Sequence, residues 1–135
     1  MKNGLGLCRD LIIAPTLSTF GIEFLYSKGV LKFSGKSYPD NSGLFFDPLL
    51  TWVDNLINSG HEKIRVEFAV SYFNTSSSKY LFQIMLRLKQ YQQQGKQLDF
   101  VWHLPSNDEE TAETWKEIME ELQLEYTMSN EAFHE

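Results

Sequence analysis

The sequence has one cysteine, three scattered histidines and no long hydrophobic run, and each of these shortages excludes a class of protein. A single cysteine, Cys8, permits neither an internal disulfide nor a metal site built from cysteines, so we interpret it as a reduced thiol. His61, His103 and His134 are not spaced as a metal-binding pair and do not adjoin paired carboxylates, so we expect no bound metal. No apolar run approaches the length that spans a bilayer, and we expect no membrane insertion.

Positive charge is also scarce. Twelve basic residues stand against eighteen acidic ones, which gives a net charge of −6 at pH 7. Nucleic-acid binding needs a basic surface, so we expect no nucleic-acid partner. The first ten residues are too few and too polar for a signal peptide, which favours a cytoplasmic location. Glycine-rich phosphate loops and the G-x-S-x-G nucleophile motif are missing, and we expect neither a cofactor nor catalysis.

What the sequence does contain is the composition of one small domain. A chain of 135 residues has an ordinary domain length, and such a chain can bury roughly two-thirds of its unfolded surface. Phe, Tyr and Trp make up 14% of the residues, which predicts an aromatic-rich core. We expect a single domain over residues 1–135, with flexible ends at 1–10 and 129–135.

The hydrophobic pattern predicts an α/β fold. Stretches with apolar residues at every second position predict strands at 22–24, 30–33, 64–70 and 98–102. Stretches with apolar residues at helical spacing predict helices at 49–57, 81–88 and 112–122. Strands at 64–70 and 98–102 should be parallel neighbours, because one helix connects them. The prediction is a mixed β-sheet covered by about three α-helices; further strands at 11–14 and 124–128 stay open.

Two helix starts can be interpreted from their capping residues. The first helix has two alternatives: Asp47 caps it with Pro48 as the first helical residue, or Asn41 or Ser42 caps a longer helix that carries Pro48 inside. For the last helix, the serine and glutamate of the 106–109 stretch fit a capping box.

A polar stretch, Ser71–Lys79, separates the strand at 64–70 from the second helix. Its residues Asn74–Ser78 place five hydroxyl or amide side chains at a helix start, where unpaired N–H groups attract acceptors and anions. One such residue is enough for a cap, so the others suit an anion or phosphorylation site. The alternative is an ordinary capped loop. Lys79 either neutralises a phosphate or is a plain surface lysine.

Two blocks of the sequence resemble a known family. Gly35-Lys36-Ser37-Tyr38-Pro39-Asp40-Asn41 resembles its G-x-S-Y-P-E-N loop, with aspartate in place of glutamate. Tyr72-Phe73-Asn74-Thr75-Ser76-Ser77-Ser78-Lys79 matches its Y-F-N-T-S-S-S-K signature throughout. These blocks are typical of the SiaC family of regulatory phosphoproteins, whose fold is similar to that of STAS-domain anti-sigma-factor antagonists. The likeness runs from about Leu11 to Met128.

The resemblance implies a function that composition and spacing do not reveal. In the SiaC family a Ser/Thr kinase phosphorylates the threonine of the signature, and a metal-dependent phosphatase reverses the reaction. The unphosphorylated protein binds and activates a diguanylate cyclase, within c-di-GMP signalling that controls biofilm formation and aggregation. On this pattern Thr75 is the phosphoacceptor and the protein is not an enzyme. The resemblance also places partner-binding or switch residues at Tyr38, Pro39, Asp40, Asn41, Tyr72, Phe73, Asn74, Ser76, Ser77, Ser78 and Lys79.

We expect Tyr72, Phe73 and the loop Tyr38–Asn41 to border Thr75 and to form part of the partner surface, since recognition residues often lie in loops. Alternatively, the two aromatic residues of the signature close the core. An alternative function is a non-enzymatic STAS-like module that binds a small anion or nucleotide at the helix start Asn74–Ser78. An enzyme with Thr75 as nucleophile would need an adjacent base, which the sequence does not show.

Overall fold

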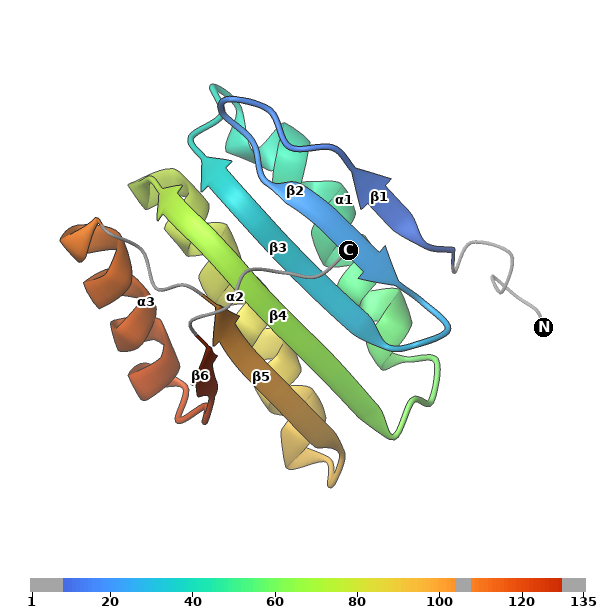
Figure 1. Ribbon diagram of the computed structural model, residues 1–135. Helices are drawn as coiled ribbons and strands as arrows, with labels where there is room; N and C mark the ends of the chain where they lie inside the picture. Colours follow the sequence, from blue (N-terminus) through green and yellow to red (C-terminus); the bar gives the residue numbers. More distant parts are fainter. Residues whose placement is uncertain (1–8, 104–107, 130–135) are drawn as a thin grey trace.

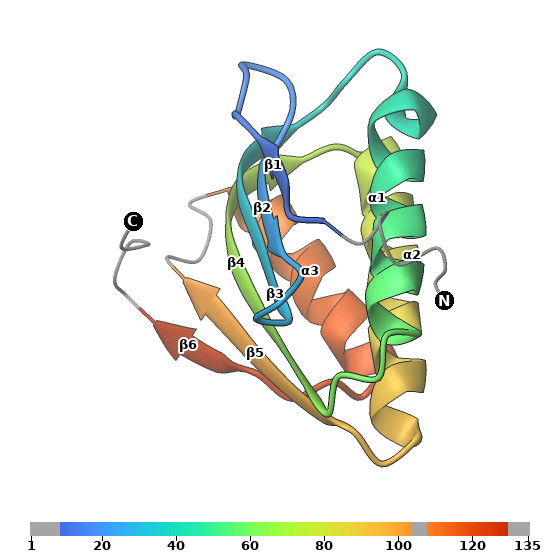
Figure 2. The same cartoon turned by 90° about the vertical axis from the view of Figure 1, so that its right-hand side faces the viewer.

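The computed structural model of this chain describes residues 9–103 and 108–129, where six strands form one sheet and three helices form one layer. The strands lie in the sheet in the same order as in the sequence (Figure 1). Seen along the edge of the sheet, all three helices cover the same face (Figure 2). The strands are β1 (Leu11–Ile13), β2 (Gly21–Leu25), β3 (Val30–Ser37), β4 (Lys63–Phe73), β5 (Gln97–His103) and β6 (Thr127–Ser129), and the helices are α1 (Ser42–Ile57), α2 (Thr75–Gln93) and α3 (Glu109–Glu121).

The predicted mixed sheet is confirmed. β1, β2 and β3 pair antiparallel, whereas β3, β4, β5 and β6 pair parallel. The sequence left strands at 11–14 and 124–128 open, and the structure has a strand in or near each range, β1 and β6. Because β1, β3, β4 and β5 run in the same direction, the loop after β1 and the starts of α1, α2 and α3 lie at one edge of the sheet. We call this edge the carboxyl edge.

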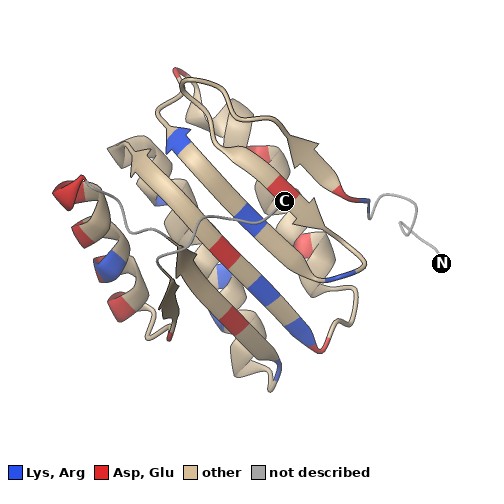
Figure 3. Cartoon of the chain, viewed as in Figure 1, with Lys and Arg blue, Asp and Glu red and all other residues tan. Residues whose placement is uncertain are grey.

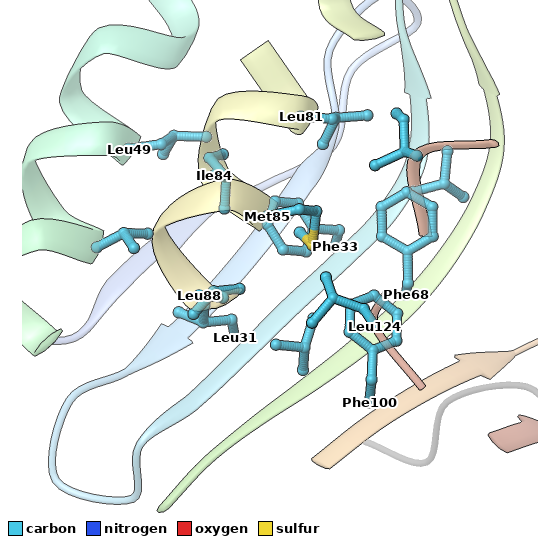
Figure 4. Close-up of a cluster of buried hydrophobic side chains, with 14 of the residues drawn as sticks. Leu31, Phe33, Leu49, Phe68, Leu81, Ile84, Met85, Leu88, Phe100 and Leu124 are labelled. Carbon is cyan, nitrogen blue, oxygen red and sulfur yellow. The ribbon is translucent and has the colours of Figure 1, made fainter. Parts of the chain in front are cut away.

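The helices bury the apolar faces that the sequence pattern predicts. Figure 4 shows Leu81, Ile84, Met85 and Leu88 of α2 within the cluster of buried side chains, and all four are fully buried. At α3, Trp115 stacks on a phenylalanine of β4 with ring centroids 3.8 Å apart. Burial of this apolar surface is the main source of stability and holds each helix against the sheet. Within the described residues, no helix has both the length and the hydrophobicity to cross a membrane.

The other face of the sheet carries charged residues of both signs (Figure 3), and opposite charges face one another across neighbouring strands. Glu23 lies opposite Lys32, and Lys32 lies opposite Glu67 on β4. The Glu67 carboxylate accepts from Arg65 Nε at 2.9 Å, and its other oxygen lies 2.9 Å from His103 Nε2. Burial acts to raise the pKa of the Glu67 carboxyl, but the hydrogen bonds from Arg65 and His103 and the charges of Arg65 and Lys32 outweigh it and lower the pKa.

β4 extends further than the pattern predicts, and the expectation that Tyr72 and Phe73 lie in a loop was wrong. Val70 pairs with Gly35 and Tyr72 with Lys36 of β3, so Ser71 is an extra residue in the ladder. Such a β-bulge shifts the alternation of side chains by one residue. Phe73 therefore turns into the core, where it is 5% exposed. The loop that we expected to begin at residue 35 begins after residue 37, because β3 extends to that residue.

The helix starts resolve the remaining alternatives. Asn41 caps α1, its Oδ1 accepting from the Leu44 N–H, and Pro48 lies inside the helix. Asp108 caps α3 and accepts from the Thr111 N–H at 3.0 Å, so the predicted capping box was wrong. The serine of that box lies outside the described residues, as do Cys8, His134 and most of the predicted flexible ends. Residue 129, the first of the predicted C-terminal tail, is the last residue of β6.

Candidate phosphorylation site and partner surface

The start of α2 is fixed by backbone and side-chain hydrogen bonds. Asn74 is the N-cap, and its Oδ1 accepts from the Ser77 N–H at 2.9 Å. The Asn74 N–H donates to the carbonyl of Ser37 at 3.0 Å, which ties the end of β4 to the end of β3. Thr75 is then the first helical residue, and the first turn of α2 contains no acidic side chain. The partial positive charge of a helix start therefore lies directly at Thr75.

The four hydroxyls of the Thr75–Ser78 run have different environments. Ser77 Oγ is buried and lies 2.7 Å from a serine hydroxyl at the end of β3. Ser76 Oγ donates to the Ser42 hydroxyl of α1 at 2.7 Å, and Ser78 Oγ donates to the Thr75 carbonyl at 2.7 Å. The Thr75 side chain is exposed, and its hydroxyl makes no hydrogen bond to any described residue. Thr75 and Ser76 are both exposed, but of these four hydroxyls only that of Thr75 has no hydrogen-bond partner among the described residues.

Thr75 also lines a cavity of about 110 Å³ between the starts of α2 and α3. One wall comes from β4 and α2, and the other includes the carboxylates of Asp108 and Glu110 with Thr111 and Thr114 of α3. Sequence reasoning missed these α3 residues, because nothing in their local pattern marks them as part of a site. The predicted parallel pairing of β4 and β5 was the available signal, since it brings the starts of the helices that follow them to the same edge.

The loop Tyr38–Asn41 lies beside this helix start. The rings of Tyr38 and Tyr72 are 6.0 Å apart in an edge-to-face arrangement. Asn41 holds the start of α1, whose first residue accepts the Ser76 hydroxyl of α2. Tyr38, Asp40 and Asn41 are exposed and Pro39 is half-buried, so this loop presents side chains next to Thr75.

Three other predicted site residues have distinct surroundings. Phe73 is in the core, so the alternative that it closes the core is correct, and Ser77 is fully buried. Both side chains therefore belong to the interior beneath the start of α2, and neither is on the surface that a partner could contact. Lys79 is exposed on α2 and forms no ion pair with a described residue, which leaves its ammonium group available. Within 9–103 and 108–129, no group of three or more His, Cys, Asp or Glu side chains is placed to hold a metal ion.

Comparison with known families gives an independent result. The model of the family described as "SiaC family regulatory phosphoprotein" matches residues 13–130. A relative in Pseudomonas aeruginosa (strain UCBPP-PA14), an uncharacterised protein, is 30% identical over 119 residues, which cover 88% of this chain and 94% of the relative. The match confirms the resemblance that the two sequence blocks indicate.

Solved structures share the fold. Apo-SiaC from Pseudomonas aeruginosa matches with a TM-score of 0.80 at 29% identity, covering 89% of this chain and 98% of that one. A second match is the SiaC chain in a crystal structure of the diguanylate cyclase SiaD in complex with its activator SiaC from Pseudomonas aeruginosa. Its TM-score is 0.81 at 30% identity, again covering 89% of this chain and 98% of that one.

Proposed function

Because the chain belongs to the SiaC family of regulatory phosphoproteins, we propose that it is a phosphorylation-switched activator of a diguanylate cyclase. A partner Ser/Thr kinase phosphorylates Thr75, and a metal-dependent phosphatase removes the phosphate. The unphosphorylated form binds and activates the cyclase and so raises c-di-GMP in the cytoplasm. Membership in a family of regulatory proteins also supports the prediction that the chain is not an enzyme.

The observation that carries the proposal is the exposed side chain of Thr75 at the positive end of α2, whose hydroxyl forms no hydrogen bond with a residue that the structure describes. Asn74 already caps this helix, so the hydroxyls are not needed for that purpose. A phosphate on Thr75 adds about −1.5 to −2 charges at neutral pH. Helix N–H groups offset part of that charge, by up to ~2 kcal/mol in a partly buried site.

In a complex the same phosphate has a different effect. A partner surface that packs against a bare hydroxyl would have to desolvate the dianion, and the effective cost is several kcal/mol. Binding is therefore lost while the fold is kept. The Pseudomonas aeruginosa complex supports the choice of partner, because the SiaC in it is an activator of a diguanylate cyclase and is similar to this chain along most of its length.

The alternative function, a module that binds a free anion or nucleotide at the start of α2, is less well supported. The cavity beside Thr75 has a volume of about 110 Å³, well below the roughly 300–1,000 Å³ of typical small-molecule sites. The carboxylates of Asp108 and Glu110 line it and repel a free anion. A covalently attached phosphate is held there despite this repulsion, whereas a free one is not.

The proposal is tested by titration calorimetry against each purified diguanylate cyclase of the native host. We expect one of them to bind wild-type protein and Thr75→Ala equally well. Protein with phosphothreonine incorporated at residue 75 should bind at least about a hundredfold more weakly, since desolvation costs several kcal/mol. Phosphothreonine at Thr51, which is exposed in the middle of α1, is the matched control and should leave affinity unchanged. Equal binding of both phosphoproteins and wild type would contradict the switch.

A further inference from the structure

Three of the exposed large apolar side chains in the described residues lie at the carboxyl edge of the sheet. In residues 9–103 and 108–129, the large apolar side chains that are exposed are Ile12, Leu17, Tyr38, Leu44 and Met128. Ile12 and Met128 lie on the two edge strands. Leu17 (88% exposed), Tyr38 (43%) and Leu44 (77%) come instead from three segments at the carboxyl edge, where α2 also begins. Single exposed leucines are ordinary, but a group of them next to a candidate site indicates an interaction surface.

Hydrogen bonds join these three segments, which we call the carboxyl-edge patch (Leu17, Tyr38 and Leu44). The Tyr38 N–H donates to the carbonyl of Ser18 at 2.8 Å, which places the loop after β1 against the loop after β3. Asn41, three residues further along that second loop, caps the helix turn that carries Leu44. The patch continues through the ring contact between Tyr38 and Tyr72 toward Thr75.

Hydrogen bonds fix the backbone segments that carry Leu17 and Leu44, although both side chains contribute little to the core. In the loop after β1, Thr16 Oγ1 accepts from the backbone N–H groups of Thr19 at 2.9 Å and Ser18 at 3.2 Å, and the Thr16 N–H donates to the Thr19 carbonyl at 3.1 Å. Leu17 lies at the tip of this turn, and Leu44 lies in the first turn of α1. A preorganised backbone loses little conformational entropy when a partner covers the side chains that it carries, so both leucines suit binding better than stability.

We propose that the carboxyl-edge patch anchors the diguanylate cyclase, with Leu17 and Leu44 as its two apolar contacts on either side of Tyr38. This inference rests on the proposed function and adds the residues that supply binding energy. The matching surface on the cyclase is apolar, with recesses for two leucine side chains. Because the patch reaches Thr75 through Tyr72, a partner seated on it covers the Thr75 hydroxyl, and the phosphate is then enclosed in the interface.

The test uses the cyclase that binds the wild-type protein in the titration described above, with Leu17→Ser and Leu44→Gln made singly. Each should weaken binding about tenfold or more, as expected for a central apolar anchor. The melting temperature should stay within about 2 °C of wild type, because substitutions of exposed side chains that pack against little else change stability only slightly. Met128→Ser, on the distant edge strand β6, is the matched control and should leave affinity unchanged. Hydrogen exchange of the complex should protect residues 16–19 and 42–46.

The outcomes separate this inference from the proposed function. If phosphothreonine at residue 75 abolishes binding but both leucine variants bind like wild type, the patch assignment is wrong and the switch stands. If light scattering shows a wild-type dimer that Leu17→Ser dissociates while cyclase binding is unchanged, the patch joins two copies of this chain and the inference is overturned. If wild-type protein binds no diguanylate cyclase, the proposed function is wrong and the patch assignment falls with it.

Discussion

Neighbouring hydroxyls in the signature have separate roles, and their positions explain why. Ser77 points into the molecule and bonds to the end of β3, whereas Ser76 bonds to the start of α1. A buried hydroxyl that loses its partner costs about 1–3 kcal/mol, so Ser77 stabilises the helix start, whereas the exposed Ser76 links that start to α1. Thr75 makes no such bond within the described residues. The hydrogen bonds of Ser76 and Ser77 thus fix the helix start at which Thr75 is exposed.

At Glu67, a single carboxylate links stability to pH. Burial acts to raise the pKa of this carboxyl, but the hydrogen bonds from Arg65 and His103 and the charges of Arg65 and Lys32 outweigh burial and lower the pKa in the folded protein. A group with a lowered folded-state pKa adds stability that is complete above its unfolded-state pKa and is lost as the pH falls through the folded-state value. Glu67→Gln should therefore lower the free energy of unfolding by ~1–2 kcal/mol at pH 7. Urea titrations between pH 7 and pH 3 should show a shallower acid loss in the variant.

The matched control for this prediction is Glu117→Gln, at an exposed position on α3. It should change neither the stability at pH 7 nor the acid dependence, because an exposed surface charge contributes little to folding stability. An equal acid loss in wild type and Glu67→Gln would show that other carboxylates control the response to low pH.

Among the elements, α3 is the one that phosphorylation of Thr75 should disturb. Its first turn contributes Asp108 and Glu110 to the cavity that Thr75 lines, so a phosphate there introduces a dianion beside two carboxylates. Like charges at short range repel, and this turn is held by the N-cap hydrogen bond that the Thr111 N–H donates to the Asp108 carboxylate. We expect amide exchange in residues 109–112 to become about tenfold faster on phosphorylation, which corresponds to ~1.4 kcal/mol of lost local stability.

Glu110→Gln should reduce that acceleration, since it removes one of the two opposing charges, while Glu117→Gln, further along α3, should not. Equal amide exchange rates in residues 109–112 before and after phosphorylation would mean that the N–H groups at the start of α2 fully compensate the charge of the phosphate. Loss of protection throughout β4 would instead mean that the modification unfolds the domain.

Element types were predictable from the sequence, but some element ends were not. Apolar alternation identified β4, yet a one-residue bulge at Ser71 reversed the alternation and hid the last residues of the strand. No local pattern reveals such a bulge, because it arises from pairing with the Gly35 region of β3. The start of α1 was also ambiguous, since Asn41 and Asp47 are both good caps. The rest of the fold decides between them by connecting the first turn of α1 to α2 through Ser42 and Ser76.

For the whole molecule, the sequence predicted the mixed sheet, the parallel β4–β5 pair and the three helices, because apolar periodicity extends over most of the chain. The signature block predicted Thr75 as the site through family resemblance. It did not predict Asp108 and Glu110 beside that residue, or Leu17 and Leu44 at the same edge. These residues meet only through tertiary structure, and their sequence neighbourhoods resemble ordinary helix starts and turns.

Phosphorylation of a protein with a net charge of −6 can block binding in two ways: through long-range repulsion between the partners' charges, or through the local cost of desolvating the phosphate. General repulsion is screened by salt, since the Debye length falls from about 10 Å at 0.1 M to about 3 Å at 1 M ionic strength. A phosphate enclosed beside the carboxyl-edge patch must lose its hydration, and salt hardly changes that cost. Raising NaCl from ~0.05 to ~0.5 M should therefore restore less than about threefold of the affinity lost on phosphorylation of Thr75. Titration calorimetry of the phosphoprotein at both salt concentrations measures this, and recovery of wild-type affinity at high salt would establish long-range repulsion as the cause.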